Sequence, residues 1–209
     1  MVTVAHESEQ GTYASELGMA LEGEPDVLVA ISYPESATIF LKEAIEGGFA
    51  GKFLFVDGTK SPEMIGRVGS QYLNGSFGTA PSTAETDARE AFKEAYSWVY
   101  GEMPPSRPFI GEAYDATVLI ALAIQKAGKA DGSAIRDALW DVANPPGEKV
   151  GPGVEGIKKA LQLIKDGKDI DYDGAAGPQD FDQFGDVVTH VEIWTIQEGK
   201  IKTVRYEMP

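Results

Sequence analysis

Two apolar segments separated by an amphipathic one constrain the fold of this chain most strongly. PDVLVAIS at residues 25–32 and KFLFVDG at residues 52–58 are continuous apolar runs, which is the pattern of strands buried in a parallel sheet. Residues 36–47 place apolar and charged side chains at helical spacing and end at a pair of glycines. Strand, helix and strand at this spacing predict a βαβ unit, whose right-handed crossover puts both strand ends at one edge of the sheet.

The residues that follow the two predicted strands are the first candidates for a binding site. Ser32 and Tyr33 follow the first strand, and Asp57 and Gly58 follow the second. Ligands of open parallel sheets bind beyond the carboxyl ends of the strands. The βαβ unit therefore selects these four residues before any other part of the chain.

The remainder of the sequence is rich in helices. Apolar spacing predicts helices over residues 12–21, 83–100, 110–127, 133–142 and 157–165, a Pro/Gly-rich loop over 144–156, and strands over 189–196 and 201–206 joined by a turn at 198–200. Between residues 82 and 165 there are several amphipathic helices and almost no strand for them to cover. We therefore expect the sheet beneath these helices to come from elsewhere.

Composition excludes several classes of function. The 209 residues carry 18 basic and 33 acidic side chains, a net charge of −15, which disfavours nucleic acid or an anionic membrane as partner. The absence of cysteine excludes disulfides, thiolate metal sites and cysteine nucleophiles. The sequence has no signal peptide, membrane span or phosphate-binding glycine loop, and its two histidines suggest no catalytic triad. We expect a soluble protein with no catalytic residue, metal or cofactor.

A stretch rich in aspartate, DIDYDGAAGPQDFDQFGDV at residues 169–187, raises the possibility of a calcium loop. With Asp180 at the first position of an EF-hand loop, the fifth position is Phe184 and the twelfth is Val191, where a bidentate glutamate is needed. No flanking helices are predicted. We therefore interpret the aspartates and glycines as turn formers that direct the chain into its last strands.

Three segments together resemble a known family. Residues 25–58, RPFIGEAYDATVLIALAIQKAG at 107–128, and residues 167–201 resemble, in the same order, parts of the branched-chain amino acid type (Leu/Ile/Val-binding) substrate-binding proteins of ABC transporters. This resemblance implies an α/β fold, the periplasmic-binding-protein type I fold, with two Rossmann-like lobes. It also implies a truncated chain that starts inside the second lobe and lacks the N-terminal first-lobe sheet.

The same resemblance implies a division of the chain into three segments. Residues 1–79 would be the second-lobe βαβ segment, residues 80–177 the first-lobe helical segment, and residues 178–209 the return to the second lobe. Hinge strands are expected near residues 78–81 and 176–179. The helices without a sheet are then explained, because their sheet would belong to the missing half.

The resemblance also assigns roles to site residues. Asp57 would take the α-ammonium group of an amino acid, and Ser32 or Tyr33 would contact the ligand through a side chain or a backbone group. Phe109 matches a position whose ring packs on the ligand side chain. The alternatives are that Asp57 caps the following turn, that Tyr33 only closes its strand, and that Phe109 belongs to the core. Tyr114 and Asp115 are interpreted as helix-packing and surface residues.

The leading hypothesis is a non-enzymatic solute-binding component of an ABC transporter for amino acids. The intact protein would deliver its ligand to a membrane permease from a periplasmic or extracytoplasmic position. The chain alone, with exposed apolar faces, is expected to self-associate. One alternative is a ligand-sensing regulatory domain of the same fold. Another is an α/β enzyme or phospho-acceptor domain that uses Asp57.

Overall fold

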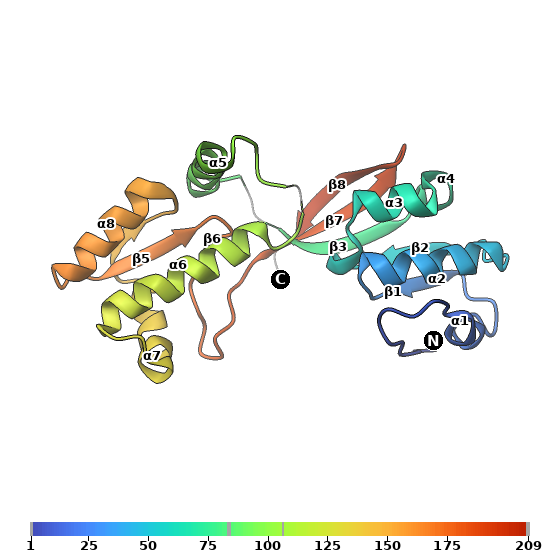
Figure 1. Ribbon diagram of the computed structural model, residues 1–209, viewed down its shortest axis with the longest axis horizontal. Helices are drawn as coiled ribbons and strands as arrows, with labels where there is room; N and C mark the ends of the chain where they lie inside the picture. Colours follow the sequence, from blue (N-terminus) through green and yellow to red (C-terminus); the bar gives the residue numbers. More distant parts are fainter. Residues whose placement is uncertain (1, 83–84, 106, 208–209) are drawn as a thin grey trace. The chain divides into compact units, whose positions relative to one another are not determined.

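A computed structural model describes residues 2–82, 85–105 and 107–207. The chain forms two compact units (Figure 1). Unit 1 comprises the residues up to 81 together with 191–207, and unit 2 comprises residues 82–190, so the chain passes twice between them. In the described ranges, no helix combines the length and apolar character needed to cross a bilayer.

Unit 1 is built around a five-stranded sheet that contains the predicted βαβ unit. Strands β1 (Val27–Ala30), β2 (Lys52–Phe55) and β3 (Phe77–Ser82) are parallel, and the predicted C-terminal pair, β7 (His190–Gln197) and β8 (Lys200–Glu207), follows as an antiparallel hairpin in the order β1-β2-β3-β7-β8. Its helices are α1 (Ala14–Ala20), α2 (Pro34–Glu46), α3 (Pro62–Val68) and α4 (Ser70–Leu73), with a 3-10 turn η1 (Asp57–Thr59). Helices α3 and α4 were not predicted.

The helices of unit 1 cover one face of the sheet and leave apolar side chains exposed on the other. Beneath the helices, the ring of Phe55 stacks on that of Trp194, with centroids 5.8 Å apart. Neighbouring residues of parallel strands point to the same face, and the opposite face carries Val27, Val29, Leu54 and Phe77, all of which remain exposed. A sheet of this kind normally has both faces covered.

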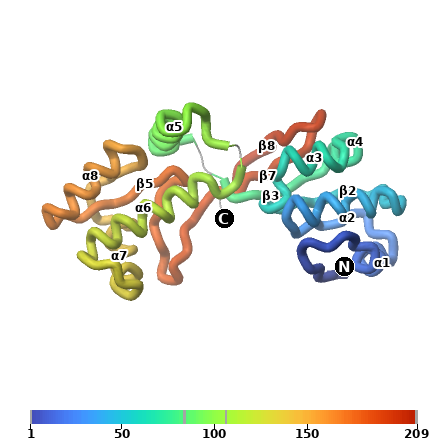
Figure 2. The backbone as a smooth tube through the Cα atoms, viewed as in Figure 1, coloured from blue at the N-terminus to red at the C-terminus, as the bar shows by residue number. Residues whose placement is uncertain are grey.

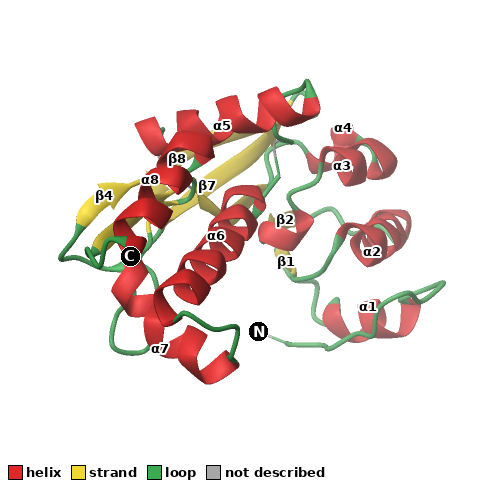
Figure 3. Cartoon of the chain, turned by 60° about the vertical axis from the view of Figure 1, so that its left-hand side comes forward, coloured by secondary structure: helices red, strands yellow, loops and turns green. Residues whose placement is uncertain are grey.

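Within the described residues, unit 2 consists of four helices, which are labelled in Figure 3, and a small three-stranded sheet. The helices are α5 (Asp87–Tyr100), α6 (Ile110–Ala127), α7 (Gly132–Ala143) and α8 (Gly153–Lys165), and the strands are β4 (Glu148–Val150), β5 (Ile170–Gly174) and β6 (Gly177–Pro178). Strand β5 lies in the middle, parallel to β4 and antiparallel to β6. The four helices confirm the predicted ones, with α8 beginning earlier than expected.

The long helix α6 is apolar on two faces. One face is buried in the core of unit 2 through Val118, Leu119, Leu122 and Ala123. A second stripe at helical spacing is exposed, and its members are small or aliphatic: Ala113, Ala116, Thr117, Ile120 and Ala121. A helix that is apolar on both faces is normally buried on both, so unit 2, like unit 1, has an apolar surface that nothing in the described chain covers.

The aspartate-rich stretch is partly a strand, contrary to the interpretation of the whole stretch as turns. Residues 170–174 form β5, with Ile170 and Tyr172 fully buried, because apolar and acidic residues alternate there with the two-residue period of a strand. Further on, the turn interpretation is confirmed. The Oδ1 atom of Asp182 accepts hydrogen bonds from the backbone N–H groups of Phe184 (2.7 Å) and Asp186 (3.0 Å).

The segment expected to carry the chain back begins with a tight hairpin. Residues 174–177 close the hairpin between β5 and β6, and the residues that follow, up to 190, group with unit 2. The hinge at 176–179 and the return from 178 stay predictions. The loop is fixed there by Asn144, whose amide donates to the carbonyl of Phe181 (2.7 Å) and accepts from its N–H (3.1 Å). The ring of Trp140 packs on Phe181 as well.

Asp115 was interpreted as a surface residue, but it is fully buried in unit 2. Its carboxylate accepts hydrogen bonds from the hydroxyl of Tyr172 (2.9 Å) and from the backbone N–H groups of Ala175 (2.8 Å) and Ala176 (2.7 Å). It therefore ties the first turns of α6 to the β5–β6 turn. Burial raises the pKa of Asp115 to about 6, although the three donors favour the ionised form.

The titration of Asp115 predicts a pH dependence of stability. Folding raises the pKa of Asp115. At pH values between the ordinary pKa of aspartate and this raised pKa, Asp115 is therefore protonated in the folded chain and ionised in the unfolded chain. The contribution of Asp115 to stability is therefore complete below about pH 4 and lost as pH rises through about 6, a change on the order of 3 kcal/mol. We expect Asp115→Asn to remove this dependence and to lower stability at low pH, measured by urea unfolding at several pH values.

A matched control is Asp141→Asn, because Asp141 is exposed on α7. This variant should follow the wild-type pH profile within about 0.5 kcal/mol. An Asp115→Asn profile parallel to that of the wild type would contradict the assignment.

Candidate functional site

The carboxyl ends of β1 and β2 bring three of the four predicted site residues together. The strands pair in parallel with Val27 beside Lys52 and Ala30 beside Phe55, so the segments that follow them leave the same edge of the sheet. A Cβ atom placed on Gly58 would lie 2.5 Å from the carbonyl oxygen of Ser32. The backbones of residues 32 and 58 are therefore in direct contact, and only glycine fits at position 58.

Asp57 does not cap the following helix, which was the alternative role for it. The hydroxyl of Ser61 caps α3 by accepting the N–H of Met64 (3.2 Å). The turn η1 is closed by buried Thr59, whose hydroxyl accepts the N–H of Val56 (3.0 Å) and donates to its carbonyl (2.8 Å). Within the described residues, the half-buried carboxylate of Asp57 has no hydrogen-bond or ion-pair partner.

The lysine in the same loop is already neutralised. Lys60 forms a buried ion pair with Glu192 of β7, and Glu192 also accepts a hydrogen bond from the hydroxyl of Thr203 on β8 (2.7 Å). Because Lys60 is engaged elsewhere, the negative charge of Asp57 stays available for a cationic group. No local pattern in the sequence indicates the Lys60–Glu192 pair, because the two residues are distant in the chain and only the fold brings them together.

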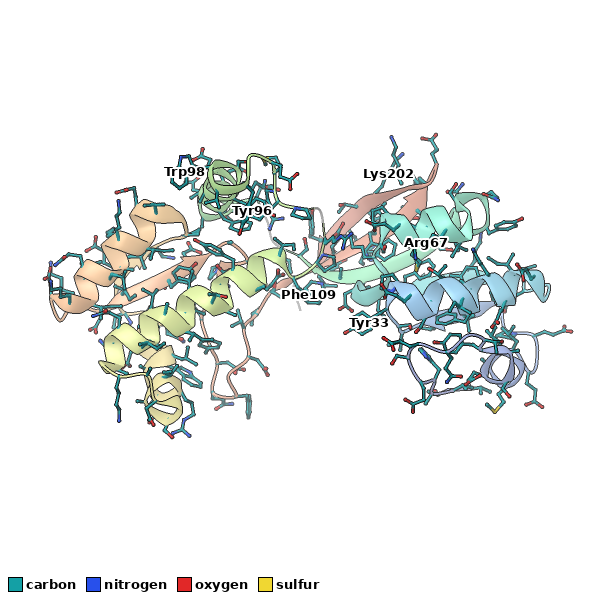
Figure 4. All side chains as sticks on the ribbon, viewed as in Figure 1. Tyr33, Arg67, Tyr96, Trp98, Phe109 and Lys202 are labelled. Carbon is teal, nitrogen blue, oxygen red and sulfur yellow. The ribbon has the colours of Figure 1, made fainter. Side chains whose placement is uncertain are left out.

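Tyr33 is exposed at the start of α2 (Figure 4). Ser32 is half-buried. Tyr33 occupies the N-cap position of α2 with an extended backbone, and Pro34 begins the helix. The ring of Tyr33 lies beside Gly58, 3.4 Å from the position that a Cβ atom would take there. An aromatic ring of which 72% is exposed contributes little to the core, so its place at the strand ends is consistent with a contact residue.

Phe109 belongs to unit 2, where it precedes α6 (Figure 4). Its side chain is 45% exposed, so it is not a core residue. Its backbone has φ = +69°, the left-handed region that bulky side chains rarely adopt. Such strain persists only where the surrounding structure imposes it, and it is found often at ligand-binding positions.

Among the described residues, neither histidine has the neighbours of a catalytic or metal-binding site. The ring of His6 packs edge-on against the rings of Tyr13 and Phe40, with centroids 5.1 and 5.6 Å away. No group of three or more histidine, aspartate and glutamate side chains in the described ranges has the geometry to hold a metal ion.

Comparisons with known proteins agree on one family. A family profile described as periplasmic binding protein matches residues 1–191. The chemotactic signal transduction system substrate-binding protein BasB of Halobacterium salinarum is 24% identical over 203 residues, which are 97% of this chain and 46% of BasB.

Solved structures of the same kind are similar in fold. The leucine-binding protein LivK of Thermotoga maritima has a TM-score of 0.70 at 22% identity, and the match covers 98% of this chain and 51% of LivK. LivJ of Streptococcus pneumoniae, a branched-chain amino acid transporter substrate-binding protein solved with isoleucine, has a TM-score of 0.63 at 18% identity, covering 97% of this chain and 49% of LivJ. The chain spans about half the length of these relatives.

The contact between Ser32 and Gly58 predicts the effect of a larger residue. We expect Gly58→Ala to force the two strand ends apart, because its Cβ atom would lie 2.5 Å from the Ser32 oxygen, and to destabilise the chain by about 1–3 kcal/mol. Urea unfolding measures the loss, and amide NMR shifts of residues 32–33 report the local displacement.

Gly66→Ala is the matched control, because a Cβ atom at Gly66 in α3 meets no atom within 4 Å. Alanine should stabilise this helix by up to about 1 kcal/mol. Equal responses of the two variants would show that close contact at Gly58 is unimportant.

Proposed function

Since the chain belongs to the periplasmic binding protein family, with the type I fold of that family, we propose that it is a non-enzymatic solute-binding component for branched-chain or related amino acids. The observation that carries the proposal is the free carboxylate of Asp57 at the carboxyl edge of β2, next to the end of β1. Ligands of open parallel sheets bind at this edge. The names of LivK and LivJ support an amino acid as the ligand class.

In the proposed site, Asp57 holds the α-ammonium group of the amino acid. A carboxylate without an internal partner gains a charge-assisted hydrogen bond from an ammonium group, and Lys60 does not compete because Glu192 neutralises it. Tyr33 and Ser32 contribute contacts from the end of β1. Phe109 stays a candidate contact on the resemblance to the family alone. Ligand would favour a closed arrangement of the two lobes by hinge motion.

The lobes of the proposed protein correspond to the two units. Unit 1 would belong to the second lobe and unit 2 to the first, with the remaining half of the family fold completing the site. The intact protein would work outside the cytoplasmic membrane and pass its ligand to a permease. Because the chain spans about half of its relatives, we expect this half alone to bind amino acids weakly or not at all.

Asp57 provides the direct test. In the intact protein that contains this chain, we expect Asp57→Asn to weaken binding of leucine, isoleucine or valine by about 10- to 100-fold, the range for a lost hydrogen bond between charged groups. Isothermal titration measures the affinities. Glu46→Gln is the control, because Glu46 is exposed at the other end of α2 and its loss should leave affinity unchanged. Unaltered binding by Asp57→Asn would exclude the proposed ammonium site.

A second candidate function is ligand sensing for chemotaxis. It is favoured by one observation, the similarity to BasB, whose name assigns it to chemotactic signal transduction. The ligand chemistry would be the same, but the closed form would be recognised by a membrane signalling protein in place of a permease. Pull-down of purified candidate permease and transducer domains by the intact protein, with and without amino acid, distinguishes the two.

The uncovered face of the sheet in unit 1 predicts self-association of the isolated chain. Leu54 and Phe77 are exposed there on adjacent strands, and apolar patches of this kind drive association. We expect light scattering to show dimers, and we expect the double variant Leu54→Lys, Phe77→Lys to shift the chain toward monomer. Tyr72→Lys, at an exposed position of α4, should have no such effect. A wild-type chain that stays monomeric would contradict the expectation.

A further inference from the structure

The turn after β2 places a lysine on the same side as the candidate ligand carboxylate. Asp57 begins η1 and Lys60 is its C-cap, with the N–H of Lys60 donating to the carbonyl of Asp57 (3.0 Å). A 3-10 turn has three residues per turn, so side chains at positions i and i+3 lie one above the other. Lys60 is also the cationic residue nearest to Asp57 along the chain. The turn itself therefore favours an ion pair between these two residues, and the structure does not form it.

The ammonium group of Lys60 is held by Glu192 of β7 instead. Glu192 is buried, and its Oε2 atom forms the ion pair with Lys60, while its Oε1 atom accepts the hydroxyl of Thr203 on β8 (2.7 Å). The strands β2 and β7 come from distant parts of the chain and are coloured blue and red in Figure 2. Because both of its oxygens are engaged, the carboxylate of Glu192 has a fixed orientation, and it fixes the position of the Lys60 ammonium group with it.

Stability alone does not explain a buried ion pair at this place. Both charges lose their hydration on burial, and two well-packed apolar side chains are often equally stable or more stable. The pair has a second consequence, because a Lys60 without Glu192 would find the carboxylate of Asp57 in its own turn. The ammonium group of lysine carries the same charge and the same donors as the α-ammonium group of an amino acid. A released Lys60 would therefore compete with such a ligand for Asp57.

We propose that Glu192 is a positioning residue for the ligand site: it holds Lys60 away from Asp57, and without it Lys60 occupies Asp57 as an intramolecular competitor of the ligand. Thr203 supports this role because it engages the second oxygen of Glu192. An internal competitor lowers the apparent affinity in proportion to the fraction of molecules in which the site remains free. The effect on amino-acid binding rests on the proposed function, whereas the movement of Lys60 does not.

Glu192→Gln in the intact protein that contains this chain tests the proposal. The amide oxygen still accepts the hydroxyl of Thr203, but the charge that holds Lys60 is removed. We expect the affinity for leucine, measured by isothermal titration, to fall by about 3- to 10-fold, which corresponds to Lys60 occupying Asp57 in roughly two thirds to nine tenths of the molecules. The double variant Glu192→Gln, Lys60→Met should recover the wild-type affinity, because it removes the competitor together with its partner.

The position of Lys60 can also be followed without ligand, through the NMR signal of the Asp57 carboxylate carbon, which Asp57→Asn identifies. We expect this signal to shift in Glu192→Gln and to return to its wild-type position in the double variant. Glu198→Gln is the matched control, because it removes the same charge from the exposed turn between β7 and β8, where the N–H of Gly199 donates to Asn74 before β3 (3.3 Å). This control should change neither the signal nor the affinity.

Three results would overturn the proposal. An affinity loss that persists in the double variant would mean that Glu192 acts through the stability of unit 1. An unchanged affinity in Glu192→Gln, or an Asp57 signal that does not move in it, would mean that the released Lys60 does not occupy Asp57. A wild-type protein that binds none of leucine, isoleucine and valine would refute the proposed function instead, and the Asp57 signal would then decide by itself whether Glu192 holds Lys60 away from Asp57.

Discussion

The parallel pairing of β1 with β2 is the constraint on which the candidate site in unit 1 depends. It brings Ser32 and Gly58 into backbone contact, at a distance that no other residue at position 58 would tolerate. In the loop after β2, the hydroxyl of Thr59 closes the turn and the hydroxyl of Ser61 caps α3. Asp57 therefore neither closes the turn nor caps the helix. A carboxylate that lies at a strand end and is not used for turn closure or helix capping remains available to bind an ammonium group.

A second constraint is that both units leave apolar surface uncovered. Unit 1 exposes one face of its sheet and the edge of β1, and unit 2 exposes a stripe along α6. The surface of unit 1 requires a covering layer of helices and a further strand, and the surface of unit 2 requires a sheet. Both requirements agree with the observation that the relatives are about twice as long as this chain.

The sequence predicted the elements whose periodicity is strong and local. The βαβ unit, the long helices and the C-terminal hairpin were all found from apolar spacing, because side-chain burial has the period of the element that produces it. Strand β5 was missed because its aspartates suggested turns, although Ile170 and Tyr172 alternate with them. Asp115 was misplaced for a different reason. Its acidic side chain suggested solvent, and its three donors come from residues 57–61 positions further along the chain.

By itself, the sequence determined the βαβ unit, the long helices, the C-terminal hairpin and the strand ends at which Ser32, Tyr33 and Asp57 lie, since these follow from patterns within short windows. Only the tertiary structure decided that Asp57 has no partner among the described residues and that Lys60 is neutralised by Glu192. Each of these features depends on contacts between residues that are distant in sequence, and a pattern within a short window of the sequence does not show which distant residues come into contact.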